Sequence, residues 1–489
     1  MKKFALLLPI LIAAAIAAQS PSTPPKPLDT AVVFTQAPFN ADFHRSDSNA
    51  FLLNRAAGTG SRLVMLQPDG SLAILTGEFS AAADPSVSFD GLRILFSAKK
   101  SPADPWNIWE MDIAGGNKRQ LTKDFGDCRE PEYLAKSAIT PPDFTDKVRW
   151  IAFTSNRTDA GPAGPSVLYV TNIEPIEKLG TVTRRATFNL CADFSPAVLS
   201  DGRVLFSSEV GCGGRSHPQV PLLAASWDGT GANLFCGAGQ GADFKTMACE
   251  TPDRHLVFVE PRGTAAGSRL ARVSFRRPLR SYEPLSRDDR NYLNPRSLPD
   301  GRLIVSCTAG RKSYGLYLFD FARGAAGAEV YADSGWETLD AQPVVPRPEP
   351  QGLISSVIDS LKWGELFCLN VYDSTLPGMS RLKNGDVKTV RFFQGSPSES
   401  TRVRPLGDAP VENDGSFFVR VPADTPLRMQ LLDSAGKTLQ GMSRWMWVRR
   451  GTSRGCVGCH EDKELAPENR VPDAILRAEP HDLFSGTQK

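Results

Sequence analysis

A unit of two short strands joined by an Asp-Gly turn recurs along the first two thirds of the chain. Its three clearest copies are 84–97, 195–207 and 295–306, and weaker copies lie at 130–155 and 251–259. Asp-Gly between alternating apolar runs is a strong local signal for a β-hairpin. The spacing of the copies gives a period of about 50 residues, which is typical of an architecture built from repeated four-stranded units.

Outer strands complete several of these units, for example at 107–113, 166–171 and 315–320. A period of this length with four strands predicts a β-propeller, and the copies resemble the blades of TolB-like propellers. Five blades can be counted directly. The segments 32–35 with 63–66, and 330–345, would supply a sixth or a seventh. We therefore expect a six- or seven-bladed β-propeller over residues 28–346.

A different pattern follows a proline-rich linker at 343–350. Residues 354–448 contain short alternating strands and turn residues, which predict a small β-sandwich-like domain. Residues 449–489 form a polar tail that follows this domain. Long amphipathic helical stretches are scarce, so the expected fold class is all-β throughout.

The tail carries the pentapeptide Cys456-Val457-Gly458-Cys459-His460. Cys-x-x-Cys-His is the attachment site of a c-type haem, in which both thiols bind the porphyrin and the histidine ligates iron. Half a zinc site, a redox Cys-x-x-Cys pair and a coincidence are the alternatives. Zinc would need a second ligand pair, but no cysteine follows Cys459 and the one later histidine is His481. We expect one covalently bound haem c, held by Cys456, Cys459 and His460.

The N-terminus indicates export. Lys2 and Lys3 precede an apolar run over residues 4–18, which is too short to span a membrane and ends in small residues. Residues 1–18 therefore read as a signal peptide, and no later stretch predicts a membrane span. The expected location is the periplasm, where c-type haem is attached.

Charge gives no case for nucleic acid or an anionic membrane as a partner. The chain has 56 basic and 54 acidic residues, mixed along its length. The partners we expect are a redox partner protein or partner subunits.

Seven cysteines lie outside the motif, so at least one of them cannot be in a disulfide within the chain. Cys128, Cys191 and Cys249 each precede the start of a blade, where loops face the central channel of a propeller. They could form a metal site there or cover a docked haem. Alternatively they form disulfides with Cys212 or Cys236, or pack as small buried side chains.

The sixth coordination position of the iron decides between electron transfer and ligand binding. Met442, Met446 and His481 are candidate distal ligands. In the alternative, the two methionines pack within the β-domain and His481 is a solvated surface residue.

Charged residues flank the motif on both sides. Arg449, Arg450 and Arg454 precede it and could pair with the haem propionates, because guanidinium groups bind carboxylates in bidentate geometry. Glu461 and Asp462 follow it, either as proton donors near the haem or as solvated charges.

The last third of the chain resembles the hydrazine synthase alpha-subunit-like proteins. The resemblance rests on the segments 369–374, 414–426, 430–433 and 454–461. It implies an N-terminal propeller, a middle β-domain and a c-type haem. The family's enzyme makes hydrazine from nitric oxide and ammonium.

Two features of that enzyme do not map onto this sequence. In the enzyme the motif histidine binds zinc, and a tyrosine four residues beyond it ligates the iron. That position is Glu464 here, so His460 is expected to be an ordinary iron ligand. The enzyme also carries a second c-type haem, for which this sequence has no second motif.

The sequence thus predicts an exported mono-haem c-type protein with a redox role. That role is either electron transfer or chemistry of small nitrogen compounds at haem iron, as in a haem oxidoreductase. The other hypothesis is a binding or scaffold propeller whose haem tail docks to a redox partner without catalysis. No catalytic residue is assigned.

Overall fold

The chain folds almost entirely into β-strands. The computed structural model describes residues 28–40, 58–135, 148–157, 164–176, 179–211, 219–237, 239–262, 267–309, 312–376, 378–396, 399–442, 444–462, 465–477 and 479–484. Within these ranges the helical elements are two short 3-10 turns, η3 (Met379–Arg381) and η4 (Asp473–Leu476). None of the described helical turns has the length and apolar character that crossing a bilayer requires. The predicted signal peptide, 1–18, lies outside the described residues.

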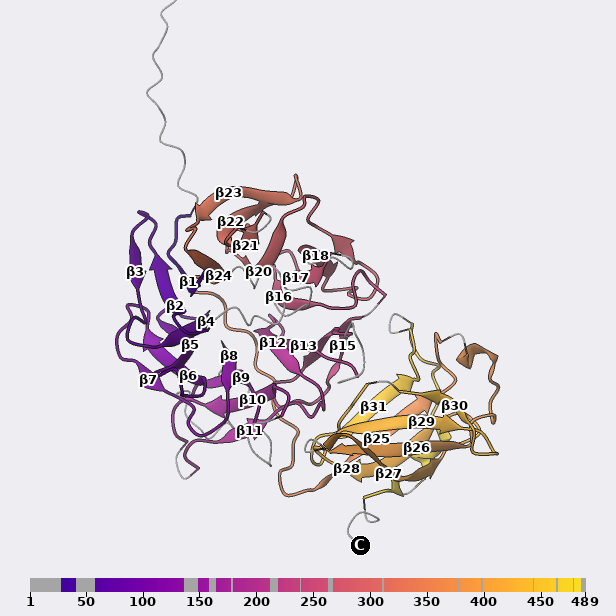
Figure 1. The fold of residues 1–489 in the computed structure, drawn as a ribbon. Helices are drawn as coiled ribbons and strands as arrows, with labels where there is room; N and C mark the ends of the chain where they lie inside the picture. The colour runs from indigo at the N-terminus through magenta and orange to yellow at the C-terminus, as the bar shows by residue number, and fades with distance from the viewer. Residues whose placement is uncertain are drawn as a thin grey trace, which may run out of the picture.

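Six four-stranded antiparallel sheets form the blades of a propeller (Figure 1). The first consists of β24 (Trp336–Pro343), β1 (Val32–Pro38), β2 (Arg62–Leu66) and β3 (Leu72–Ile74). The second contains β4 (Ala81–Val87), β5 (Arg93–Lys99), β6 (Asn107–Asp112) and β7 (Arg119–Gln120), and the third β8 (Cys128–Tyr133), β9 (Trp150–Ser155), β10 (Val167–Asn172) and β11 (Thr183–Arg185).

The other three blades follow in chain order. The fourth contains β12 (Asp193–Val198), β13 (Val204–Ser208), β14 (Leu222–Ala225) and β15 (Asn233–Cys236). The fifth contains β16 (Thr246–Glu250), β17 (His255–Pro261), β18 (Ser268–Ser274) and β19 (Glu283–Pro284), and the sixth β20 (Asn291–Ser297), β21 (Leu303–Thr308), β22 (Gly315–Asp320) and β23 (Ala325–Tyr331).

The first blade is made from both ends of the propeller sequence. Strand β24 pairs antiparallel with β1, with Val32 opposite Pro343, and supplies the innermost strand beside three strands from the N-terminal end. The late segment expected to add a sixth or seventh blade therefore completes the sixth and closes the first. Backbone hydrogen bonds across this join hold the ring together, and the described residues form six blades.

A bulge interrupts the innermost strand of every blade. At each bulge one residue has φ between 46° and 55°, and the six are Asp84, Glu130, Ser195, Met247, Asn294 and Asp340. The pairing register shifts at each of these positions. A bulge re-aims the side chain of the extra residue, and all six line one cavity inside the ring.

The second domain is a sandwich of two four-stranded sheets. One consists of β31 (Ser453–Gly458), β25 (Trp363–Asn370), β28 (Phe417–Pro422) and β32 (His481–Asp482). The other consists of β27 (Glu399–Pro410), β26 (Thr389–Ser396), β29 (Leu427–Leu432) and β30 (Thr438–Gly441). Apolar side chains from the facing sheets, among them Leu366, Phe392 and Val419, form its core. These two domains confirm the predicted all-β class and the order of propeller and sandwich.

The segment from 449 onward does not form a separate tail. Strand β31 pairs in parallel with β25, and β32 pairs in parallel with β28, so both strands belong to the sandwich. Residues 445–448 make one isolated bridge, between Met446 and Leu427. Because backbone groups make the pairing, β31 needs no alternation of apolar side chains and was invisible as a strand in the sequence.

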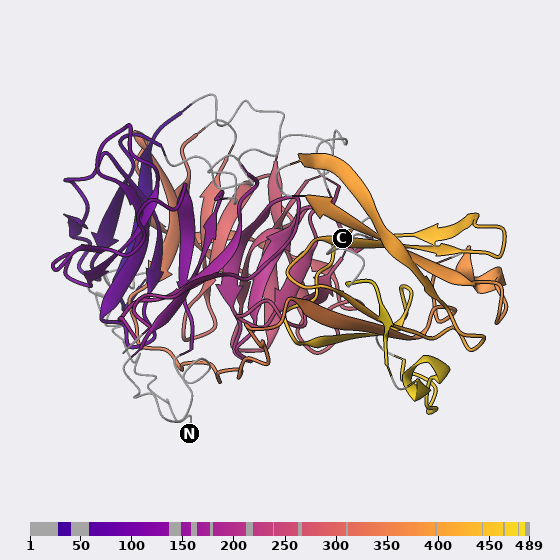
Figure 2. The same cartoon turned by 90° about the horizontal axis from the view of Figure 1, so that it is seen from below.

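The sandwich lies against one side of the propeller (Figure 2). Trp447 is buried in the same apolar cluster as side chains of the third and fourth blades. Its indole N–H donates to the carbonyl oxygen of Gly229 at 3.0 Å. The indole N–H of Trp227 donates to the carbonyl oxygen of Leu353, between the linker and the second domain, at 2.7 Å. This contact fixes which blade faces the motif.

Candidate functional site

The three chemically distinctive residues of the pentapeptide share one cavity. Cys456, Cys459 and His460 line a cavity of about 350 Å³ between the sandwich and the fourth blade. Its walls are mostly apolar. They include Leu223 and Leu234 from the propeller and Phe417, Met429, Leu431, Trp445 and Trp447 from the sandwich domain.

Local backbone constraints place the motif. Gly458 ends β31 where the chain passes close to Asp373, and a Cβ atom at Gly458 would lie 2.1 Å from the Asp373 carbonyl oxygen. Beyond it His460 has φ of 66°, a left-handed conformation. The His460 carbonyl oxygen accepts hydrogen bonds from the backbone N–H of Thr375 at 3.0 Å and from its hydroxyl at 2.8 Å. The turn after the second thiol is thus tied to the sandwich.

A third thiol lies at the same cavity. Cys368 on β25 is buried, lines the cavity and is directly opposite Cys456 in the parallel pairing. Burial raises the pKa of Cys459 to about 11 and raises that of Cys368 well above its usual value. Burial also lowers the pKa of His460, which favours the neutral imidazole that ligates metals. The position of Cys368 gave no signal in the sequence because it is far from the motif along the chain.

The candidate distal ligands separate into two groups. Met442 and Met446 both line the cavity, together with Met429, which the sequence analysis did not single out. His481 lies on β32, where it pairs with Val419, and it is exposed and absent from the cavity wall. Only the methionines are brought together with His460.

Of the three arginines before the motif, one lines the cavity and two do not. Arg449 and Arg450 both form ion pairs with Asp424, at 2.6 and 2.7 Å, and neither lines the cavity. Arg454 does line it and donates to the carbonyl oxygens of Trp447 and Ala232.

Arg444 is a cavity residue that sequence reasoning missed. It lines the wall beside Trp445, and its Nη2 atom is shielded from solvent without a hydrogen-bond partner in the described part of the chain. A single charge inside the apolar run from Met442 to Trp447 was the available signal. The two acidic residues after the motif take different positions. Glu461 lines the cavity, whereas Asp462 forms an ion pair with Arg280 of the propeller.

The three propeller cysteines do not form a cluster. Cys191 is disulfide-bonded, whereas Cys128 and Cys249 are buried free thiols. Burial raises their pKa values to about 11 and about 12. Among the residues that the structure describes, no three His, Cys, Asp or Glu side chains are arranged to hold a metal ion. Cys236 is also free, while Cys212 and Glu464 lie outside the described residues.

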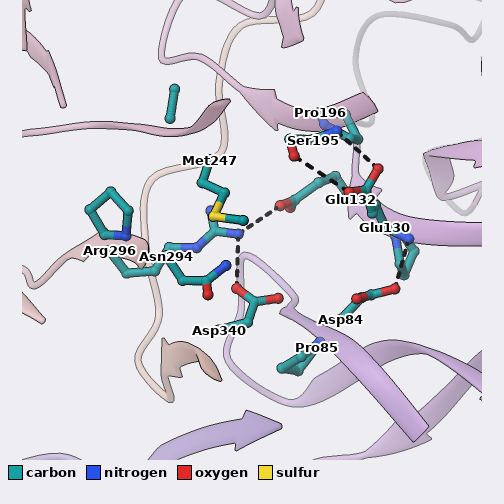
Figure 3. Close-up of a pocket in the computed structure, with 13 residues that line it drawn as sticks. Asp84, Pro85, Glu130, Glu132, Ser195, Pro196, Met247, Asn294, Arg296 and Asp340 are labelled. Carbon is teal, nitrogen blue, oxygen red and sulfur yellow. Dashed lines mark hydrogen bonds and ion pairs between the residues drawn. The ribbon is translucent and has the colours of Figure 1, made fainter. Parts of the chain in front are cut away.

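A second, smaller cavity of about 40 Å³ lies within the ring of inner-strand bulges (Figure 3). Arg129 binds Asp84 through two hydrogen bonds of 2.6 and 2.9 Å. Burial and the charge of Asp84 raise the pKa of Glu130 to about 7, although the backbone N–H of Ser195 donates to it.

Across this cavity Arg296 lies between two carboxylates, 3.4 Å from Glu132 and 3.5 Å from Asp340 (Figure 3). Burial raises the pKa of Asp340 to about 6, against the opposing charge of Arg296. The cavity at the propeller axis is therefore lined by buried acids and arginines, and two of the acids, Glu130 and Asp340, have raised pKa values that favour the protonated form.

Comparisons with known proteins find similarity to hydrazine synthase alpha subunits. The model of the hydrazine synthase alpha subunit middle domain matches residues 375–461, a range that includes the whole pentapeptide. Hydrazine synthase subunit alpha of Kuenenia stuttgartiensis is 28% identical, over 82% of this chain and 62% of the relative. The chain therefore spans less than two thirds of that relative's length.

A solved structure of similar fold covers most of this chain. Hydrazine synthase of Kuenenia stuttgartiensis matches with a TM-score of 0.79 at 25% identity, over 91% of this chain and 71% of that chain. TolB of Acinetobacter baumannii matches 66% of this chain and 68% of its own, with a TM-score of 0.42 at 12% identity. The resemblance inferred from the last third of the sequence is confirmed, because the chain is similar to hydrazine synthase alpha subunits in the sequence of its second domain and in its fold.

Proposed function

We propose that this is an exported c-type haem protein with a redox role, carrying one covalently bound haem. The observation that carries the proposal is the shared cavity: both motif thiols, the motif histidine and two methionines line one mostly apolar space. A tetrapyrrole needs such apolar walls with ligands at one side, so the residues present fit the group.

Each residue has a definite role in this proposal. Cys456 and Cys459 would hold the porphyrin through thioether bonds, and the His460 imidazole would ligate the iron. The Thr375 hydrogen bonds to the His460 carbonyl oxygen hold the histidine backbone in place. Bound in this way, the group supplies one-electron exchange between ferric and ferrous iron. The aromatic walls at Trp445 and Trp447 limit access of water to it.

Whether a side chain occupies the sixth coordination position of the iron decides between electron transfer and catalysis. Met442 and Met446 both line the cavity, and a thioether ligand from either would favour electron transfer. An open position would instead allow small nitrogen compounds to bind, as the name of the relative, hydrazine synthase subunit alpha, suggests for this chain. That name also supports partner subunits as the redox partners. Residues 1–18 support export to the periplasm.

The decisive experiment is expression of the full chain in a host that matures periplasmic c-type cytochromes. Intact mass and a pyridine haemochrome spectrum should show one covalent haem. Replacing both thiols, Cys456→Ala with Cys459→Ala, should abolish attachment. Cys368→Ala is the matched control, because this thiol lines the same cavity outside the motif, and it should retain the haem. A wild-type chain without covalent haem overturns the proposal.

Spectroscopy of the loaded protein then separates the two redox roles. A low-spin ferric spectrum that nitric oxide leaves unchanged indicates electron transfer. A high-spin ferric spectrum with uptake of nitric oxide indicates an open site. Met442→Leu and Met446→Leu should identify the distal ligand, because only the variant that removes it converts low-spin iron to high-spin.

A further inference from the structure

Two arginine side chains line the cavity of the pentapeptide and form no ion pair with a carboxylate of the described residues. The Nη2 atom of Arg444 has no acceptor among the described residues and no contact with solvent. Arg454 donates only to the carbonyl oxygens of Trp447 and Ala232 within the described contacts, at 2.9 and 2.7 Å. A charged group shielded from water is unfavourable unless an opposite charge and hydrogen bonds compensate it.

The pKa of Arg444 also indicates that its charge is poorly compensated. Burial, reinforced by the positive charge of Arg454, lowers the pKa of Arg444 to about 10. The acid that counters this effect is Asp193, whose carboxylate already accepts hydrogen bonds from Ser208 and Asn189. Glu461 is the carboxylate among the described cavity residues, and it forms no ion pair with either arginine. Among the described residues, the wall therefore presents two guanidinium groups and one carboxylate that pairs with neither of them.

Two other arginines near the motif already have a carboxylate partner. Arg449 and Arg450 share the carboxylate of Asp424 and lie outside the cavity wall. Their ion pairs hold the segment before β31 to the turn after β28. This leaves Arg444 and Arg454 as the guanidinium groups that face the site with hydrogen-bonding capacity to spare.

We propose that Arg444, assisted by Arg454, binds the propionate carboxylates of the tetrapyrrole in this cavity, an inference that rests on the proposed function. The group attached to Cys456 and Cys459 brings two carboxylates into an apolar space. Guanidinium is the cation best suited to receive them, because its planar fork matches a carboxylate in two parallel hydrogen bonds. Arg444 would then be compensated only in the loaded protein.

The first test is the reduction potential of the loaded protein. Arg444→Gln should retain covalent haem and lower the potential, because a positive charge near the ring favours the reduced iron, which carries less positive charge. Arg444→Lys keeps the charge and should leave the potential near that of the wild type. It also serves if the glutamine variant folds poorly. Arg450→Gln is the matched control from the same segment and should leave the potential unchanged.

The second test compares stability with and without haem. Arg444→Met should lower the midpoint of thermal unfolding in the loaded protein. It should raise that midpoint in a haem-free background carrying Cys456→Ala and Cys459→Ala, where the buried charge has no partner. A merely structural arginine would shift both midpoints in the same direction, and that result overturns the assignment. Wild-type protein without covalent haem contradicts the proposed function itself, before any arginine variant is measured.

Discussion

Cys368 and Cys456 lie directly opposite each other on the parallel strands β25 and β31. The first thiol of the pentapeptide is therefore part of the sandwich sheet and not of a free tail. The second thiol and the histidine follow through a turn that the Thr375 hydrogen bonds hold in place. This pairing makes the geometry of the motif depend on the fold of the whole second domain.

The close approach at Gly458 gives the first prediction. Gly458→Ala should destabilise the sandwich by about 1–3 kcal/mol, because the new methyl group meets the Asp373 carbonyl oxygen at 2.1 Å. Chemical denaturation followed by intrinsic fluorescence measures the change. Gly378→Ala is the control, since nothing lies within 4 Å of its Cβ position, and it should change stability by about 0.5 kcal/mol or less. Equal effects of the two substitutions would show that the contact at Asp373 is unimportant.

Trp447 should hold the two domains together. Its side chain is 2% exposed in a cluster with the third and fourth blades. Trp447→Ala should destabilise the protein by about 3–5 kcal/mol and separate unfolding of the sandwich from that of the propeller. Trp447→Phe keeps most of the packing and loses the hydrogen bond to Gly229, so it should cost about 1 kcal/mol. Differential scanning calorimetry reads both, and a single unchanged transition in the alanine variant would contradict this role.

Glu130 should make the propeller less stable as pH rises. The pKa of this carboxyl is raised from 4.5 to about 7 in the folded chain. Between these values the unfolded state has lost a proton that the folded state retains, so the free energy of unfolding falls with increasing pH. The loss should amount to about 3 kcal/mol at full ionisation. Urea titrations across this pH range measure it.

Glu130→Gln should remove its own part of this pH dependence and leave the part that Asp340 contributes, because the amide does not titrate and can still accept the hydrogen bond from Ser195. The exposed Glu329 offers a control, and Glu329→Gln should keep the wild-type slope. A Glu130→Gln variant with the wild-type slope would assign the titration to another group, of which Asp340 is the next to test.

Asp414 should behave in the opposite way at low pH. Burial raises its pKa, but hydrogen bonds from Ser416, the backbone N–H of Asp473 and Arg470 prevail and lower it to about 2. A depressed pKa stabilises the fold above the ordinary value of 3.8, and this contribution is lost as pH falls toward 2.

Asp414→Asn should therefore cost about 2 kcal/mol near neutral pH and nothing at the acid end. Limited proteolysis should show cleavage of the segment around 467–476 first, because Asp414 holds Arg470 and Asp473 against the sandwich. Arg391→Gln, which breaks an exposed ion pair with Asp408 on the same domain, is the control and should not expose that segment.

The repeat of Asp-Gly turns determined the propeller from the sequence alone, because each hairpin is a local structure whose turn and strands are adjacent in the chain. The number of blades could not be determined from local sequence. It depended on β24 returning to pair with β1, and only the closed ring decided it. The pentapeptide was equally plain in the sequence, since its five residues are contiguous.

What surrounds the pentapeptide was decided by tertiary structure. Cys368 and Arg444 reach the cavity through strand pairing and domain packing, and His481 is carried away from it by β32. Such placements come from backbone hydrogen bonds and apolar burial between segments far apart in the chain, which leave little trace in any short stretch of sequence. The sequence by itself determined the local units and the motif. The tertiary structure decided which side chains face the motif, because only packing brings those segments together.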